Sequence, residues 1–359
     1  MHFPWERTLP VSEGNSRVEE EQRYVCLFGS VVFRGFALEH FHDTTYTSRQ
    51  KNYMHYERNE SFGIGVVRET AERFVLAPEL ITARGILFNC DCMLLFSGMR
   101  SESVDLVFAD PPFNLGKDYG THRVHDAHSE EHYLLWCKQW LSECIRVLKP
   151  GGSLFIYNIP KWQISIGAYL NERLQFRHWI AITMKNNYPR GNRLYPAHYG
   201  LLYYVKGKDF NFNRLRVPIP TCRHCGKELR DYGGHRDKLN PVGLNLTDYW
   251  DDTSPVRHSK FKKRTANELK PVIPRRAILI ASNEGDIVLD PFGGGGSTFE
   301  EAEKHGRYWI GSEIGDCTAI GQRLSGLLPY ERLTPDSKLV RVFIEPAQVL
   351  PVLKRTSAS

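Results

Sequence analysis

Short apolar runs alternate with helical patterns through most of the chain. Residues 85–90 and 104–109 have the length and composition of buried strands, whereas apolar side chains recur at helical spacing over residues 132–148. The same pattern predicts further strands at residues 153–157, 176–184, 199–205, 287–289 and 308–312, and a helix at residues 298–305. Strands that alternate with helices favour an α/β fold built on a parallel sheet.

The pattern is weaker towards both ends of the chain. Residues 25–38 predict a pair of strands, but the rest of residues 1–78 carries no clear period or motif. Residues 340–344 predict one short strand within the last 30 residues. The sequence shows no internal repeat, so the alternating middle part carries the fold prediction.

Composition excludes several classes of protein. With 41% hydrophobic and 25% charged residues, the chain is typical of globular proteins rather than disordered ones. No apolar run reaches the length of a membrane-spanning helix, and the first residues lack the pattern of a signal peptide. Eight scattered cysteines do not form a disulfide framework. We therefore expect a soluble, cytoplasmic protein with no membrane partner and with reduced thiols.

Positive charge is concentrated in one segment. The 359 residues carry a formal net charge of +6, but residues 206–276 alone hold 17 Lys or Arg and 8 Asp or Glu, a net charge of +9. The rest of the chain is therefore slightly negative. A localised basic segment favours an anionic partner, although a solvated surface also carries such charge.

One pair of cysteines in this segment raises the question of zinc. Cys222 and Cys225 have the spacing of two zinc ligands, and His224 lies between them. A structural zinc site needs four ligands, and the second pair is missing, although His235 or His258 could contribute. The sequence favours two thiols without metal, with a zinc site as the alternative.

A glycine-rich loop follows the predicted strand at residues 287–289. The loop, Gly293 to Gly296, precedes a predicted helix, and backbone N–H groups at such a place favour a carboxylate or phosphate. A tight turn that binds nothing would have the same composition. Glu313, however, ends the next predicted strand, where doubly wound folds hold a ribose diol. Together these features favour a nucleoside ligand.

A second motif, Asp110-Pro111-Pro112-Phe113, directly follows the predicted strand at residues 104–109. Its prolines fix the backbone just beyond a strand end, where parallel sheets bind ligands. Asp110 and the Pro111 carbonyl would accept hydrogens from an exocyclic amine, and Phe113 would stack on the ring that carries the amine. The motif indicates a nucleobase pocket. The alternative is a strand end closed by prolines, with Phe113 in the core.

Together the two motifs resemble those of DNA amino-methyltransferases. Asp110 to Phe113 matches the Asp-Pro-Pro-Tyr/Phe catalytic motif of that family, and residues 290–296 match its Phe-x-Gly-x-Gly S-adenosylmethionine motif. The catalytic motif comes first, with a basic segment between the two, as in the circularly permuted β class. This resemblance implies a Rossmann-like α/β fold: a seven-stranded S-adenosylmethionine-dependent methyltransferase sheet with an inserted basic target-recognition region.

The resemblance also divides the chain and orders the sheet. It implies an unassigned N-terminal extension (1–78), a catalytic half (79–205), a target-recognition region (206–265), a cofactor-binding half (266–329) and a C-terminal extension (330–359). Residues 287–289 and 308–312 would be the first two strands of the usual sheet, residues 85–90 the third, and residues 104–109 the fourth.

The resemblance assigns site residues at the matching positions. Catalysis would rest on Asp110, Pro111, Pro112 and Phe113, without a covalent cysteine intermediate. Asp91 would contact the adenine amine of the cofactor, and Glu313 its ribose hydroxyls. The other implied cofactor-binding residues are Cys92, Asn267, Asp290, Pro291, Phe292, Gly293, Gly294, Gly295, Ser297 and Thr298.

Double-stranded DNA is the partner that the resemblance implies. The basic residues expected at its phosphates are Lys185, Arg190 and Arg193 in one loop, and Arg257, Lys260, Lys262, Lys263 and Arg264 in the basic segment. A target base must be flipped out of the duplex to be reached. Asn114 would contact the base edge or serve as a turn residue, and residues 115–131 would close over the site. A homodimer and a cognate restriction endonuclease are expectations from the class.

The expected function is site-specific methylation of adenine N6 in DNA, because Asp-Pro-Pro is more typical of the adenine enzymes of the family. Cytosine N4 is the near alternative. RNA as substrate is another, and a non-catalytic DNA-binding protein with a relic cofactor pocket is a third. The completeness of both motifs argues against a relic.

Overall fold

The chain forms two compact units, Met1–Glu72 and Arg73–Ser359. The computed structural model describes residues 25–28, 31–34, 55–58, 65–68, 76, 78–116, 128–183, 192, 194, 196–219, 221, 225–227, 233–234, 238–253, 269–327 and 337–344. In the first unit, β1 (Val25–Phe28) pairs antiparallel with β2 (Val31–Arg34), which confirms the strand pair predicted there. A second antiparallel pair joins β3 (His55–Arg58) to β4 (Gly65–Arg68).

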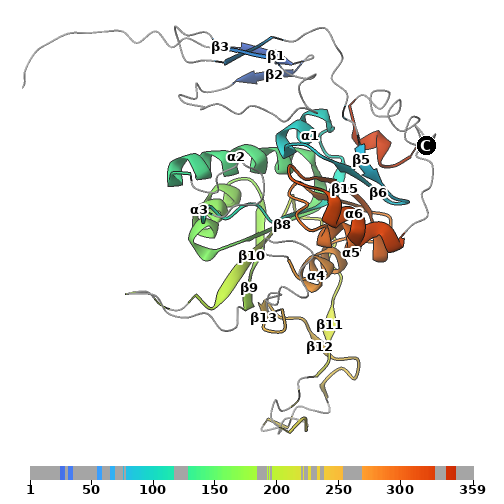
Figure 1. Ribbon diagram of the computed structural model, residues 1–359. Helices are drawn as coiled ribbons and strands as arrows, with labels where there is room; N and C mark the ends of the chain where they lie inside the picture. The colour runs from blue at the N-terminus through green and yellow to red at the C-terminus, as the bar shows by residue number, and fades with distance from the viewer. Residues whose placement is uncertain are drawn as a thin grey trace, which may run out of the picture. The chain divides into compact units, whose positions relative to one another are not determined.

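The second unit is built on one nine-stranded sheet with the order β13-β9-β10-β8-β7-β14-β15-β6-β5. Figure 1 shows this sheet with helices packed around it. Its strands are β5 (Pro78–Ile81), β6 (Gly85–Phe88), β7 (Val104–Ala109), β8 (Leu148–Asn158), β9 (Gln175–Thr183), β10 (His198–Val205), β13 (Tyr249–Trp250), β14 (Ile287–Asp290) and β15 (Tyr308–Ser312). The parallel strands β6, β15, β14 and β7 lie side by side in the order expected for strands three, two, one and four. The expected Rossmann-like arrangement is therefore confirmed.

The sheet is larger than the seven strands expected. β5 pairs antiparallel with β6 at one edge, and the two-residue strand β13 pairs parallel with β9 at the other. β10 runs antiparallel to both of its neighbours, β8 and β9. Short edge strands of two and four residues carry too little period to be predicted from sequence.

Helices cover both faces of this sheet. On one face lie α1 (Cys92–Gly98), α2 (Glu130–Val147) and α3 (Pro160–Asn171), and on the other α4 (Val272–Ala281), α5 (Ser297–Lys304) and α6 (Thr318–Leu324). In β8, Leu154 and Ile156 face the first group, whereas Phe155 and Tyr157 face the second. This alternation follows from the two-residue period of a strand.

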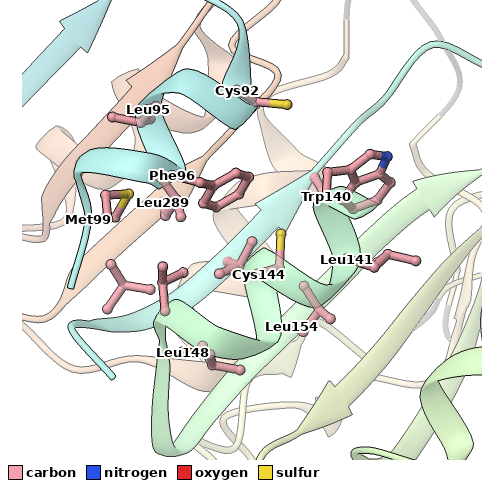
Figure 2. Close-up of a cluster of buried hydrophobic side chains, with 14 of the residues drawn as sticks. Cys92, Leu95, Phe96, Met99, Trp140, Leu141, Cys144, Leu148, Leu154 and Leu289 are labelled. Carbon is pink, nitrogen blue, oxygen red and sulfur yellow. The ribbon is translucent and has the colours of Figure 1, made fainter. Parts of the chain in front are cut away.

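Figure 2 shows how the first face is packed. Side chains of α1 and α2, with Leu154 of β8 and Leu289 of β14, fill the space between helices and sheet. Trp140, Leu141 and Cys144 all belong to the predicted helical pattern, which confirms that this pattern marks a core-facing helix. The Cys144 thiol is completely buried, and burial raises its pKa.

Two short strands and two 3-10 turns complete the second unit. β11 (Arg216–Val217) pairs antiparallel with β12 (Leu244–Asn245), and one 3-10 turn, η3, spans Ser325–Leu327. The strand predicted at residues 340–344 is wrong: Val340–Val342 form a second 3-10 turn, η4. Val340, Val342 and Phe343 are buried all the same, and an apolar run this short does not distinguish a strand from a buried turn.

None of the helices in the described part of the chain combines the length and the apolar character needed to cross a membrane.

Candidate active site

Acidic side chains follow the carboxyl ends of four adjacent strands. Asp290 is the last residue of β14, Asp110 follows β7, Glu313 follows β15, and Asp91 lies three residues beyond β6. Because these strands are parallel, their carboxyl ends lie at one edge of the sheet. The fold thus brings together two motifs that are 180 residues apart in the chain.

The glycine loop between β14 and α5 is held by backbone hydrogen bonds. The Gly293 N–H donates to the Ser312 carbonyl over 2.8 Å, and the Gly294 N–H donates to Glu313 Oε2 over 2.6 Å. Gly294 and Gly296 have φ of 54° and 76°, the left-handed region that favours glycine. The loop needs these two glycines for its own conformation, before any ligand is considered.

Glu313, the expected ribose contact, holds the loop through both carboxylate oxygens. Besides Gly294, it accepts the Gly315 N–H at Oε1 over 2.8 Å. The side chain of Asn89 donates to the backbone carbonyls of Glu313 and Gly315, over 2.7 Å and 2.8 Å. Since each carboxylate oxygen has two lone pairs, Glu313 retains acceptor capacity for ligand hydroxyls.

Asp290 is the most strongly perturbed acid of the site. The pKa of its carboxyl is raised to about 7, mainly by burial, and the nearby Glu313 charge acts in the same direction. Hydrogen bonds from the Thr298 side chain and from the Phe292 N–H, the latter over 2.9 Å, favour the ionised form and limit the rise. Thr298 therefore contacts Asp290, and its predicted cofactor role stays a prediction.

Asp91 caps a helix. Its Oδ1 accepts the Met93 N–H over 2.8 Å at the start of α1, and burial raises the pKa of the carboxyl. The side chain of Cys92 lies in the hydrophobic core, and Figure 2 shows it beside α2. A contact of Asp91 with a cofactor adenine stays a prediction. For Cys92 any such contact would fall to its backbone.

The remaining loop residues are tied to neighbouring elements. Ser312 Oγ donates to the Pro291 carbonyl over 2.9 Å, and Arg323 Nε donates to the Gly295 carbonyl over 2.6 Å. Ser297 Oγ donates to the Leu269 carbonyl over 3.0 Å. These contacts fix the shape of the loop. They neither confirm nor contradict the cofactor roles expected for it.

Phe292 carries an aromatic contact that links the glycine loop to α2. Its ring centroid lies 5.7 Å from that of Trp136 and 5.1 Å from that of Trp140. Both tryptophans belong to the helical pattern predicted over residues 132–148. Their position beside the glycine loop becomes visible only once the sheet order is known.

In the Asp-Pro-Pro-Phe motif, two of the backbone carbonyls are held by buried side chains. Tyr133 Oη of α2 donates to the Pro112 carbonyl over 2.7 Å, and Trp162 Nε1 of α3 donates to the Phe113 carbonyl over 2.7 Å. Within the described residues, no group donates to the Pro111 carbonyl. This is the carbonyl that the sequence assigned to a base amine.

Phe113 lies in a cluster of three aromatic rings. Its centroid is 5.8 Å from those of Tyr157 and Tyr199, and these two are 5.1 Å apart. Burial raises the pKa of the Tyr157 phenol, and the nearby Asp110 carboxylate raises it further. Phe113 is only 8% exposed and packs within the core, so its stacking on a base stays a prediction.

Asn114 serves as a turn residue rather than presenting its amide to the site. Its φ is 55°, a left-handed conformation that Asn adopts more readily than most residues. The side-chain amide donates to the His128 carbonyl over 2.9 Å, and its oxygen accepts the His128 N–H over 2.7 Å. The amide group is thereby committed to His128, which leaves the base-edge contact without support.

Several predicted site residues lie outside the described residues. They are Lys185, Arg190, Arg193, Arg257, Lys260, Lys262, Lys263, Arg264, Asn267 and Cys222, together with most of the loop expected at residues 115–131. Cys225 is exposed. Within the described part of the chain, no group of three or more His, Cys, Asp or Glu side chains is placed to hold a metal ion.

Two described residues that flank the basic residues 257–264, Asp252 and Leu269, make side-chain or backbone hydrogen bonds. Arg276 of α4 forms two hydrogen bonds with the Asp252 carboxylate, over 2.9 Å and 2.6 Å, and its guanidinium lies over the Trp250 ring. The Arg276 bond lowers the pKa of Asp252. Leu269, beyond the other end of the run, accepts the Ser297 hydroxyl. Asp252 thus contacts α4, and Leu269 contacts α5.

Comparison with known proteins agrees with this geometry. The N6/N4 family model described as DNA methylase matches residues 104–319, a range that includes both motifs. This range is more than half of the chain, and the chain therefore belongs to this DNA methylase family. S-adenosylmethionine, the cofactor implied by the sequence motifs, accords with that membership.

Individual proteins are similar to this chain to different extents. M.BamHI, a type II methyltransferase of Bacillus amyloliquefaciens, is 54% identical over 250 residues, which are 69% of this chain and 59% of that protein. DNA adenine methyltransferase YhdJ of Escherichia coli K12 is 30% identical over 233 residues, 64% of this chain and 78% of that protein. The match to M.BamHI thus spans less than two thirds of that relative's length.

A solved structure shares the fold. PvuII DNA methyltransferase, described as cytosine-N4-specific, superimposes with a TM-score of 0.53 at 16% sequence identity, covering 79% of this chain and 96% of that one.

Proposed function

We propose that this chain is an S-adenosylmethionine-dependent DNA methyltransferase that acts on an exocyclic amine of a base. One observation carries the proposal: Asp110, with the Pro111 carbonyl beside it, and the glycine loop that follows Asp290 lie at the carboxyl ends of the adjacent parallel strands β7 and β14. A donor site and an acceptor site are thereby held next to each other, which is the requirement of a transfer reaction.

The residues around the glycine loop suit the methyl donor. S-adenosylmethionine, when bound, supplies a methyl group on a positively charged sulfur. Glu313 and Asp91 offer carboxylate oxygens at neighbouring strand ends for hydroxyl and amine groups. The loop lacks side chains at residues 293–296, so a ligand can approach its backbone closely.

Asp110 and Pro111 would prepare the amine for attack. The lone pair of an exocyclic base amine is delocalised into the ring, and the nitrogen is therefore a weak nucleophile. Hydrogen bonds from its two N–H groups to the Asp110 carboxylate and the Pro111 carbonyl pull the nitrogen towards a tetrahedral form. The lone pair then points out of the ring plane. Attack would form the N–C bond as the C–S bond of the methyl donor breaks. S-adenosylhomocysteine would leave as a neutral thioether, and the methylated amine would lose one proton to water.

Double-stranded DNA is the proposed partner. The base would have to be flipped out of the duplex, at a cost of a few kcal/mol. The net charge of +9 over residues 206–276 would neutralise phosphates next to the site. The name of M.BamHI, a type II methyltransferase, supports a role beside a cognate restriction endonuclease.

Adenine N6 is the proposed acceptor, and cytosine N4 is the second candidate. The motif begins with Asp110, and YhdJ, described as a DNA adenine methyltransferase, is 30% identical over most of its length. PvuII methyltransferase, described as cytosine-N4-specific, has the same fold, so the fold does not choose between the two bases. Both amines would make the same pair of contacts with Asp110 and Pro111.

Product analysis tests this proposal. The purified protein is incubated with unmodified DNA and S-adenosylmethionine, and the digested nucleosides are identified by mass spectrometry. We expect N6-methyldeoxyadenosine from the wild type and none from the Asp110→Asn variant. The Asp286→Asn variant, changed at the amino end of β14, should still form the product. N4-methyldeoxycytidine would overturn the choice of base and keep the mechanism. No methylated DNA, with the cofactor still bound, would favour an RNA substrate or a non-catalytic protein.

A further inference from the structure

The backbone of the Asp-Pro-Pro-Phe motif is held by hydrogen bonds from side chains of other elements. Its two prolines, Pro111 and Pro112, have no N–H group, so the motif cannot be fixed by donating hydrogen bonds from these positions. The support comes instead from donors that hold its carbonyls. Tyr133 of α2 and Trp162 of α3 provide them, and both are almost completely buried.

The two donors form one packed unit. The ring centroids of Tyr133 and Trp162 are 4.7 Å apart, with their planes tilted by 50°. They hold consecutive carbonyls, those of Pro112 and Phe113. Two consecutive peptide planes are therefore fixed from the same side. With the φ angle of Pro112 set by its ring, little freedom is left for the carbonyl of Pro111.

Asn158 determines which way the Tyr133 hydroxyl points. Its side-chain N–H donates to Tyr133 Oη over 3.0 Å, and its oxygen accepts the Ile159 N–H over 2.7 Å. The bond to Ile159 identifies which atom of the amide is the oxygen, and Asn158 must then be the donor towards Tyr133. The tyrosine proton is thereby left for the Pro112 carbonyl. Asn158 is completely buried, so water does not compete for these bonds.

We propose that Tyr133 and Trp162 are positioning residues for methyl transfer, and that Asn158 orients the Tyr133 hydroxyl. By holding the Pro112 and Phe113 carbonyls, they would fix the direction of the Pro111 carbonyl, which together with the Asp110 carboxylate would receive the two hydrogens of the base amine. Neither Tyr133 nor Trp162 reaches the reacting atoms. This inference rests on the proposed function. It adds to it the residues that set the geometry of the acceptor site.

The Tyr133→Phe variant tests the inference because it removes one hydroxyl and keeps the ring. Misplacement of reacting groups by about 1 Å costs roughly 100-fold in rate. We expect the single-turnover rate of methyl transfer to fall by about 10- to 100-fold, with the Kd values for DNA and for S-adenosylmethionine unchanged within about twofold. Single-turnover conditions are needed so that product release does not conceal the chemical step.

A matched control is available in Tyr204→Phe. Tyr204 is as buried as Tyr133, and its hydroxyl also bonds a helix. Its oxygen lies 2.8 Å from Asn171 Oδ1 and 3.2 Å from the Gly167 carbonyl oxygen, and its one proton can be donated to either. Both variants lose a buried tyrosine hydroxyl, and we expect similar losses of thermal stability. Only Tyr133→Phe should lose transfer rate. Equal rates for the two variants would overturn the inference.

A double variant tests whether Asn158 acts through Tyr133. In the Tyr133→Phe background, the further change Asn158→Ala should slow methyl transfer by less than about twofold, since its only predicted route to the site has already been removed. Additive losses of rate would show that Asn158 acts in another way and would contradict its assigned role. An inactive wild-type protein would instead refute the proposed function, which separates the two failures.

Discussion

Asp290, at the carboxyl end of β14, is a buried acid whose ionised form is disfavoured by its surroundings. Burial places the pKa of Asp290 at about 7, against an ordinary value of 3.8. Between these values the folded protein binds more protons at this group than the unfolded chain. The free energy of unfolding should therefore fall as the pH rises from about 4 to about 7.

The substitution Asp290→Asn should remove that dependence. The variant and the wild type should differ little near pH 5, where the wild-type carboxyl is protonated in the folded state. Near pH 8 the variant should have a higher free energy of unfolding than the wild type, because it does not bury a charge at this position. Urea unfolding at both pH values measures this. The same stability difference at pH 5 and pH 8 would contradict the account.

Glu313 is the residue on which the shape of the glycine loop depends. Its two oxygens accept N–H groups of Gly294 and Gly315, and Glu313→Gln would set an amide N–H₂ against one of these donors. A lost hydrogen bond of this kind costs about 1–3 kcal/mol. The Kd for S-adenosylmethionine, measured by calorimetry, should rise by about tenfold or more. Glu143→Gln, at the far end of α2, serves as the control, and equal affinities for the two variants would refute this role.

At the scale of elements, close packing explains why the loop between β14 and α5 is rich in glycine. A Cβ atom at Gly293 would lie 2.8 Å from the Phe299 ring and 3.1 Å from the Ser312 carbonyl oxygen. Gly293→Ala should therefore destabilise the protein by about 1–3 kcal/mol through overpacking. A Cβ atom at Gly321, inside α6, would have no described atom within 4 Å apart from those of its chain neighbours and of the backbone of its own helix. Gly321→Ala should be neutral or stabilising by up to about 1 kcal/mol. Equal effects in urea unfolding would contradict the packing argument.

Elements also show where sequence reasoning succeeds. The apolar runs at residues 104–109 and 308–312 coincide with β7 and β15, since long buried strands between turn residues have few other interpretations. The sequence does not predict the helix α3, although Pro160 begins it, because burial there does not follow polarity: Gln163 is buried and Ile164 is exposed. The short edge strand β13 depends on pairing with β9, which no local pattern indicates.

The candidate site was predicted only where a motif names its residues. Asp110, Asp290 and Glu313 meet at one edge because the permuted strand order is correct. The sequence does not assign Tyr133 to the site, because an aromatic residue at helical spacing most often belongs to the core. Trp162 lies in α3, a helix that the sequence does not predict. The side chains of these two residues donate to carbonyls of residues that lie 21 and 49 positions earlier in the chain, and the sequence does not show such contacts.

For the whole molecule, the distribution of charge makes a separate prediction. If residues 206–276 neutralise DNA phosphates, the affinity for DNA should fall steeply with salt concentration. A plot of the logarithm of the binding constant against the logarithm of the salt concentration should have a slope of about −0.9 for each phosphate contact. The variant Lys262→Ala/Lys263→Ala should bind DNA more weakly and with a shallower slope. Lys138→Ala, an exposed change on α2, should alter neither quantity. Fluorescence titrations between low and physiological salt measure both slopes, and a slope unchanged by the double variant would place the phosphates elsewhere.

The central claim is that Asp110 acts on the base amine while the glycine loop holds the methyl donor. The most direct test compares wild type and Asp110→Asn in single-turnover transfer of a labelled methyl group to DNA, with calorimetric measurement of S-adenosylmethionine binding to both. The account predicts that the transfer rate falls by at least about 100-fold, since charge-bearing contacts to the reacting group are lost. The affinity for the cofactor should stay the same. A variant that transfers the label at the wild-type rate would contradict the claim.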